Sequence, residues 1–248
     1  MKLLPLLLSA GLAFTSAYAQ TEPALNVVFI GDSITAGAHI TDKAAAELAR
    51  LKPEYKVAFS NQGHSGATTF DFQPPETKYF KAIPPEAKKL LDSHPGPLVF
   101  PIMLGTNDSA NKGPKGSPVA AQDYHDNLKK IIDTLLAEFP EAKFVLHHPI
   151  WYSPNTHNRS DYEGDSAANR LKSYFPVLES LVKEYAATKP GHVFLGDVDG
   201  YDYFAAHHKT ELKEENGQNG IFYLHPNDAG AQSLAKFWAA AIAKVVSP

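Results

Sequence analysis

The stretch NVVFIGDSITAG, residues 26–37, joins a buried strand to the start of a helix. Its first six residues form an almost continuous apolar, β-branched run, which is typical of a strand covered on both faces of its sheet. Four further runs of this kind lie at 55–61, 97–105, 143–149 and 192–197. Helical patterns lie at 42–51, 84–93, 121–139, 166–188 and 227–245. The alternation predicts right-handed βαβ units, a parallel sheet and therefore an α/β fold.

Long irregular stretches follow the carboxyl ends of these strands, at 62–83, 106–120, 149–165 and 198–226. Open α/β sheets bind ligands at this edge. Loops of this length inside a compact domain more often carry function than not. We therefore expect the functional site to be built from these four segments.

Residues 1–19, MKLLPLLLSAGLAFTSAYA, have the features of a secretory signal peptide. They combine one Lys, an apolar run and an Ala-Tyr-Ala ending, and the run is too short to span a bilayer. A buried first helix of the fold is the alternative interpretation. We predict a secreted or periplasmic protein whose residues 20–248 form a single domain, with no membrane partner.

Composition excludes several classes of function. The chain has 248 residues and a formal net charge of −4, without the basic stripe that nucleic-acid binding requires. It contains no cysteine, so neither disulfides nor thiolate chemistry are possible. The histidine pairs His147-His148 and His207-His208 do not have the spacing of metal ligands with a carboxylate. We expect no metal site, and the oligomeric state stays open.

Ser33 stands directly after the first predicted strand, at the start of a helix. A hydroxyl group there can act as a nucleophile, because the backbone N–H groups of a helix start favour developing negative charge. An Asp-Ser pair before a helix is also a common helix cap, so both interpretations are open for Asp32-Ser33. The motif differs from the Gly-x-Ser-x-Gly elbow of α/β-hydrolases.

Three further residues are expected beside Ser33. Gly63, after the second strand, offers an unobstructed backbone N–H, and Asn107, after the third, offers an amide donor. Asn is also a common turn former. His225 precedes the last helix and can accept a proton. Acyl transfer needs this combination of a hydroxyl group, a base and donors for the tetrahedral oxyanion.

Four blocks of the sequence together resemble the GDSL, or SGNH, hydrolases, in the order of that family: GDSIT (31–35), NQGHSG (61–66), GTND (105–108) and HPND (225–228). The resemblance implies a flavodoxin-like three-layer α/β/α fold with a five-stranded parallel sheet. It also implies a serine esterase without a cofactor, in which Ser33 is the nucleophile and His225 the base. The oxyanion hole would consist of the Ser33 and Gly63 N–H groups and the Asn107 side chain.

One position departs from the family, which usually has an Asp three residues before the His. Phe222 stands there. We favour a backbone carbonyl, such as that of Phe222, as the acceptor for the imidazole Nδ1–H. A carboxylate from residues 197–215 is the second possibility, and Asp228, which is better placed to stabilise a helix end, is the third. The candidates in the 197–215 segment are Asp197, Asp199, Glu214 and Glu215.

Trp151 and Tyr152 follow the fourth strand and are our candidates for substrate contacts. Aromatic residues at such places belong to the core more often than to a site, but an exposed Trp151 would suit a sugar ring. Together with the signal peptide, this favours removal of acetyl groups from a carbohydrate through a Ser33 acyl-enzyme. The partner would be a small-molecule or polysaccharide acyl ester. A lipid- or aryl-directed esterase or thioesterase, and a non-catalytic carbohydrate-binding relative, are the alternatives.

Overall fold

A computed structural model describes residues 23–246 of the chain, so the predicted signal peptide, residues 1–19, lies outside the described residues. The strands are β1 (Ala24–Gly31), β2 (Lys56–Gly63), β3 (Leu98–Met103), β4 (Lys143–Leu146), β5 (Val193–Leu195), β6 (Leu212–Gly217) and β7 (Gly220–Pro226). The helices are α1 (Ser33–Ala36), α2 (Ile40–Leu51), α3 (Lys78–Ser93), α4 (Ala121–Glu138), α5 (Gly164–Thr188), α6 (Gly200–Glu211) and α7 (Asp228–Val245).

Strands β1 to β5 form a parallel sheet in the order β2-β1-β3-β4-β5. This is the flavodoxin-like strand order. All eight residues of β1 are buried, because β1 lies between β2 and β3 and is covered by helices on both faces. The predicted five-stranded parallel sheet is therefore confirmed, with each of its strands within a few residues of the predicted run.

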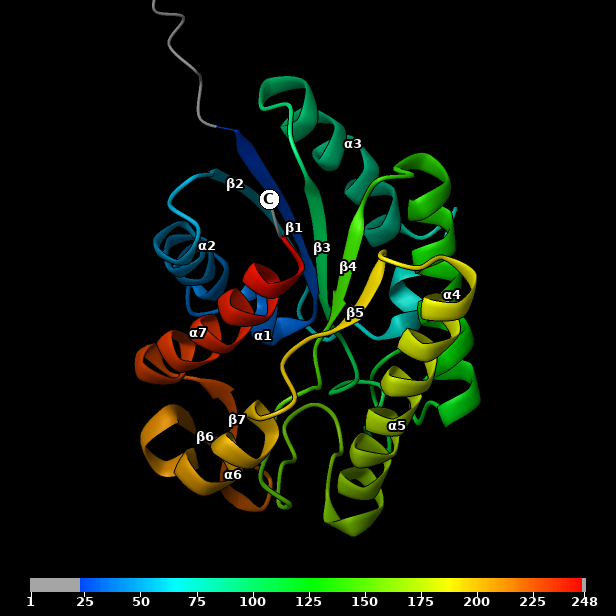
Figure 1. Cartoon of the computed structure of the whole chain (residues 1–248). Coiled ribbons are helices and arrows are strands. Elements are labelled where there is room, and N and C mark those ends of the chain that lie inside the picture. Colours follow the sequence, from blue (N-terminus) through cyan, green and yellow to red (C-terminus); the bar gives the residue numbers. More distant parts are fainter. Residues whose placement is uncertain (1–22, 247–248) are drawn as a thin grey trace, which may run out of the picture.

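The helices cover the sheet in two layers (Figure 1). Helices α2 and α7 pack on one face, where Leu48 and Trp238 belong to the same apolar cluster as Phe29 of β1. Helices α3, α4 and α5 pack on the other face around Phe100 and Phe144. The three-layer α/β/α architecture is confirmed. Among residues 23–246, no helix is both long enough and apolar enough to cross a membrane.

The segment 198–226, predicted to be irregular, is where the structure differs from the sequence expectation. It contains α6 followed by an antiparallel hairpin of β6 and β7. The hairpin lies beyond the main sheet, beside α6 (Figure 1). It carries His225 on its second strand, so the histidine is held by a strand rather than by a loop.

Candidate active site

Ser33 lies at the carboxyl edge of the sheet, where β1 ends and α1 begins. Asp32 caps α1, since its Oδ1 accepts a hydrogen bond from the Ile34 N–H at 2.9 Å. The cap leaves the Ser33 side chain free to face His225. Both interpretations of the Asp-Ser pair therefore hold. Asp32 is the helix cap, and Ser33 presents its hydroxyl group at the carboxyl edge of the sheet.

Two hollows meet at Ser33 and His225. The larger, called the Ser33 cavity here, has a volume of about 410 Å³. It is lined by Ser33, Ser65, Gly66, Thr106, Asn107, Asn158, Arg159, Ser160, Tyr162, Leu224 and His225. The smaller, called the Lys213 cavity, has a volume of about 170 Å³ and is lined by Ser33, Ile34, Gly37, Ala38, Ser65, Lys213, His225 and Pro226. A substrate therefore has room on both sides of the Ser33 hydroxyl group.

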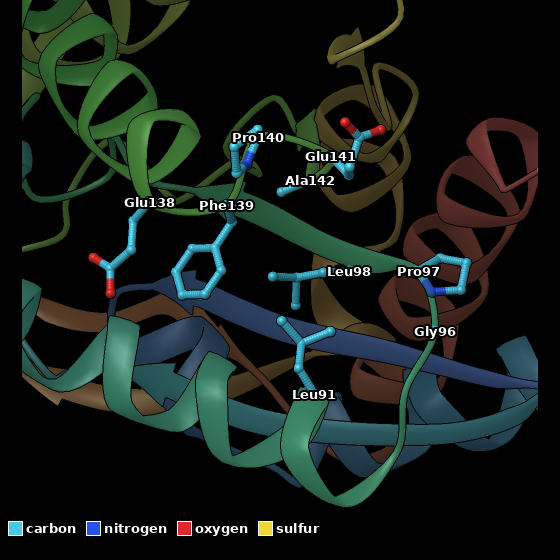
Figure 2. Close-up of a pocket in the computed structure, with 9 residues that line it drawn as sticks. All are labelled: Leu91, Gly96, Pro97, Leu98, Glu138, Phe139, Pro140, Glu141 and Ala142. Atoms are coloured by element: carbon cyan, nitrogen blue, oxygen red, sulfur yellow. The ribbon is translucent and has the colours of Figure 1, made fainter.

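A third hollow, of about 300 Å³, is unrelated to this site (Figure 2). It lies where β3 begins, at the amino edge of the sheet and thus opposite Ser33, between Leu91, Leu98 and Phe139. Its lining residues include no serine and no histidine. It lacks the groups for acyl transfer.

Ser33 and His225 are in hydrogen-bond contact. Ser33 Oγ lies 2.8 Å from His225 Nε2, although the two residues are 192 positions apart in the chain. On the other side of the ring, His225 Nδ1 lies 2.9 Å and 3.0 Å from the two carboxylate oxygens of Glu215. A carboxylate can only accept, so Nδ1 carries the proton and Nε2 accepts from the Ser33 hydroxyl group.

The favoured expectation of a backbone carbonyl behind His225 is therefore wrong, and a carboxylate from the 197–215 segment stands there instead. Glu215 lies on β6 and is paired with Phe222 of β7. Burial alone would raise the pKa of the Glu215 carboxyl, but the hydrogen bond from His225 and the charge of that ring outweigh it, so the pKa lies below its ordinary value. Glu215 is ionised at neutral pH and supplies the negative charge that the histidine faces.

None of the other four candidate carboxylates bonds to His225, and three of them have partners of their own among residues 23–246. Asp197 accepts hydrogen bonds from the N–H groups of Asp199 and Gly200, and Asp199 stands before α6. Glu214 accepts from the Tyr223 hydroxyl group at 3.1 Å. Asp228 forms an ion pair with Lys43 at 2.9 Å.

Asn107 lies in the Ser33 cavity with its amide held in one orientation. The Tyr162 hydroxyl group donates to Asn107 Oδ1 at 2.6 Å, and Asn107 Nδ2 donates one hydrogen to the Ala67 carbonyl at 3.0 Å. An amide nitrogen has two hydrogens, so one is left for a ligand. Asn107 and Tyr162 are both buried. Sequence reasoning did not find Tyr162, because no motif marks it.

Gly66, rather than Gly63, is the glycine at the site. Gly63 does not line the cavity, and its N–H donates to Asn61 Oδ1 at 2.8 Å. A Cβ atom at Gly63 would lie 2.4 Å from the Ala36 nitrogen, so this glycine permits close packing of β2 against α1. Gly66 lines the cavity in a left-handed conformation, with φ of 75°, and its N–H donates to no group among residues 23–246. The predicted role of Gly63 as an oxyanion donor is wrong.

Two buried carboxyl groups lie close to the site, Asp32 beside Ser33 and Asp108 beside Asn107. Burial raises the pKa of Asp32 to about 6. Burial, with a further contribution from the Asp32 charge, raises the pKa of Asp108 to about 7. Asp108 Oδ1 accepts from the Thr69 N–H at 2.9 Å and from its hydroxyl group, which ties the loop after β3 to the segment that follows Gly66.

The two predicted aromatic contacts do not reach the site. Tyr152 is buried, and its hydroxyl group lies 2.9 Å from Ser109 Oγ. Trp151 is half-buried, packs against His208 and lines neither cavity. The aromatic ring that borders the Ser33 cavity is that of Tyr162.

One group of side chains among residues 23–246 has the arrangement of metal ligands. It comprises His157, Asp161 and Glu163, whose ligand atoms lie within 4.8 Å of one another. His157 Nδ1 lies 3.3 Å from Glu163 Oε2, and the Glu163 N–H donates to Asp161 Oδ1 at 2.8 Å, so contacts within this loop account for the proximity of the three side chains. The histidine pairs have other contacts: the ring of His148 stacks on Phe175, and His147 Nδ1 accepts from the Asp197 N–H.

The profile of the GDSL-like lipase/acylhydrolase family matches residues 29–232. The chain belongs to this family. It is accordingly a carboxylic ester hydrolase of the GDSL type, and the match extends from β1 into α7, across all the residues around Ser33. No curated protein sequence matches the chain significantly.

Solved structures similar to this GDSL-type chain include three enzymes. An alpha/beta hydrolase enzyme from the metagenome of Lake Arreo is 22% identical, covers 92% of this chain and 99% of its own, and has a TM-score of 0.59. An acetylxylan esterase from Geobacillus stearothermophilus is 20% identical to this chain. The match covers 90% of this chain and 96% of the esterase, with a TM-score of 0.57. The aryl esterase of M. smegmatis is 16% identical. The match covers 90% of this chain and 100% of the aryl esterase, with a TM-score of 0.60. At these identities the likeness shows the fold.

Proposed function

We propose that this GDSL-type hydrolase is a secreted serine esterase that removes acetyl groups from a carbohydrate through a Ser33 acyl-enzyme. The observation that carries the proposal is the chain of contacts from Ser33 through His225 to Glu215. Secretion rests on the sequence of residues 1–19 alone.

The contacts define how the first step runs. His225 Nε2 takes the proton of Ser33 as Oγ attacks the ester carbonyl carbon, and the imidazolium that forms is stabilised by Glu215. His225 then returns the proton to the leaving alcohol, which leaves an acyl group on Ser33 Oγ. Water then attacks the acyl carbonyl carbon while His225 Nε2 takes its proton. The bond between the acyl group and Ser33 Oγ breaks, the carboxylic acid leaves, and His225 returns the proton to Ser33.

Three donors are available for the negative charge of the tetrahedral intermediate. They are the backbone N–H of Ser33 at the start of α1, the backbone N–H of Gly66 and the second hydrogen of Asn107 Nδ2. Preformed donors of this kind stabilise charge that develops only in the transition state. Gly66 takes the place that the sequence had suggested for Gly63.

The lining of the Ser33 cavity supports a small, hydroxyl-rich substrate. Ser65, Thr106, Asn158 and Ser160 contribute polar groups, whereas Leu224 is the one aliphatic side chain in the lining. The cavity is also small, about 410 Å³, which suits a short acyl group beside a sugar ring. An acetyl group on a sugar suits this environment. The similar fold of an acetylxylan esterase is consistent with it.

An acyl-chain series tests the proposal. We expect kcat/KM for esters of one alcohol to fall from acetyl to butanoyl to octanoyl, and acetylated saccharides to be hydrolysed. A fluorophosphonate probe should label the wild-type protein and not Ser33→Ala. A preference for octanoyl esters would favour a lipid-directed esterase, and absence of labelling would indicate a non-catalytic relative.

A further inference from the structure

Arg159 stands on the wall of the Ser33 cavity at the tip of a tight turn. The residues on either side bond to each other: the Asn158 N–H donates to the Ser160 carbonyl at 3.2 Å, and the Ser160 N–H donates to Asn158 Oδ1 at 2.9 Å. The turn thus closes around Arg159, which is exposed on the loop between β4 and α5.

The backbone that carries the turn is held on both sides. The Asp161 N–H donates to the Lys112 carbonyl at 2.9 Å, and the Gln218 N–H donates to the His157 carbonyl at 2.8 Å. These two anchors come from different parts of the chain, one after β3 and one in the β6–β7 hairpin. Because the backbone at Arg159 is already fixed, a ligand that binds there loses less free energy to the ordering of the loop.

The guanidinium group of Arg159 has no partner in the described part of the chain. Among residues 23–246, no carboxylate lies within 4 Å of it and no acceptor bonds to it, whereas Arg50 bonds to Glu47 and Arg170 donates to the Ser109 carbonyl. The lining of the Ser33 cavity includes no Asp or Glu. The cavity wall therefore presents an uncompensated positive charge on a chain whose net charge is −4.

We propose that Arg159 binds an anionic group, a carboxylate or a sulfate, on the sugar of the ester substrate, an inference that rests on the proposed function. A guanidinium group presents paired N–H donors that match a carboxylate or sulfate in a two-point contact. Lys213, in the smaller cavity, is less suited, because its charge already acts on Glu215 and lowers the pKa of that carboxyl. The preferred substrate class is thus the acetyl ester of an acidic saccharide.

The test compares three substrates with the acetyl group at the same position: an acetylated methyl glucoside, the matching methyl glucuronoside and the matching glucoside 6-sulfate. We expect kcat/KM to be about 10- to 100-fold higher for an anionic ester than for the neutral one, the range of a charged hydrogen-bonded contact. Added salt should reduce this ratio, since exposed charges are screened. Arg159→Gln should bring the ratio close to one, and Arg159→Lys should restore part of it.

Arg50→Gln is the matched control, because it removes an exposed arginine that lies on α2 and lines neither cavity. It should leave the ratio unchanged. A wild-type ratio near one, with the neutral ester hydrolysed, would overturn the role of Arg159 and leave the proposed function standing. The role of Arg159 would also be overturned if the preference for anionic esters disappeared in Lys213→Gln but persisted in Arg159→Gln. Hydrolysis of none of the three esters would instead contradict the proposed function itself.

Discussion

Glu215 binds His225 at three points. Its two carboxylate oxygens lie 2.9 Å and 3.0 Å from the ring Nδ1, and one of them also accepts the backbone N–H of His225 at 3.1 Å. The acid therefore comes from β6, ten positions before the histidine. In the family's usual pattern it lies three positions before. The Glu215 carboxylate therefore fixes the orientation of the imidazole ring and also determines that Nδ1, rather than Nε2, carries the proton.

Strand geometry explains why position 222 does not supply the acid. Successive side chains of a strand point to opposite faces, so residues three apart in β7 face opposite ways. Phe222 and Leu224 are buried, whereas Tyr223 and His225 lie on the open face. A carboxylate at position 222 would point into the core, away from the imidazole. Once the last block lies on a strand, the acid has to come from a neighbouring segment.

Replacing Ser33 by Ala tests the assignment of the nucleophile. We expect ester hydrolysis to be lost almost completely, because only binding and the oxyanion donors would remain. The melting temperature should change little, since the hydroxyl group contributes little to the core. The measurement is kcat on an acetyl ester, together with thermal unfolding. Retained turnover in Ser33→Ala, combined with its loss in Ser65→Ala, would move the nucleophile to Ser65.

Asn107 and Tyr162 are expected to act as one unit. Asn107→Ala should lower kcat by about 10² to 10³-fold with little change in KM, as removal of one oxyanion donor does. Tyr162→Phe removes the hydroxyl group that holds the amide and should cost about tenfold, less than the loss of a donor itself. A double-mutant cycle measures the coupling. The double variant should be no slower than Asn107→Ala alone, and strictly additive effects would contradict the coupling.

Asp108 should make the stability of the protein depend on pH. Its pKa is about 7 in the folded state, against 3.8 ordinarily, so the folded state holds the proton more tightly. The stability that this proton contributes is present below pH 3.8 and is lost as the pH rises towards about 7. In Asp108→Asn that loss should be absent. Relative to the variant, the wild-type free energy of unfolding should fall by more than about 1 kcal/mol between pH 4.5 and 8.

Urea unfolding of both proteins at several pH values measures this difference. Acidic groups that do not interact with Asp108 contribute equally to the two profiles and cancel, whereas Asp32, whose charge raises the pKa of Asp108, is coupled to it and contributes to the difference. Parallel profiles would show that Asp108 titrates normally in the folded state.

The sequence was sufficient for the parts of the site that lie in local motifs. Ser33 follows a strand that hydrophobic patterning predicts, and Asn107 and His225 lie in blocks that resemble those of the family. The parallel sheet followed from the same patterning. That residues 20–248 form a single domain stays a prediction.

Contacts between distant segments could not be predicted in the same way. Tyr162 reaches Asn107 across 55 positions, and only the packed structure brings them together. Gly63 and Gly66 stand in one block, and sequence alone did not indicate which N–H would be occupied by Asn61. The hairpin of β6 and β7 was missed because β6, with the sequence LKEENG, is short and polar and has no apolar run to mark it as a strand, although β7 does alternate between buried and half-buried residues.

Replacing Glu215 by Gln tests the central claim. The claim is that this carboxylate orients the catalytic histidine and stabilises the positive charge that the ring gains during the reaction. A glutamine can present an N–H to Nδ1, which would place the imidazole proton on Nε2 and prevent it from accepting the proton of Ser33. We expect kcat to fall by about 10⁴-fold, as for amide replacement of a triad acid. Glu214→Gln, one position away and bonded to Tyr223, is the matched control.

The decisive measurement is kcat on an acetyl ester for these two variants, each with thermal unfolding close to that of the wild type. A loss of about 10⁴-fold in Glu215→Gln, with less than about tenfold in Glu214→Gln, is the result expected for a true triad acid. A folded Glu215→Gln variant that keeps more than a tenth of the wild-type kcat would contradict the claim.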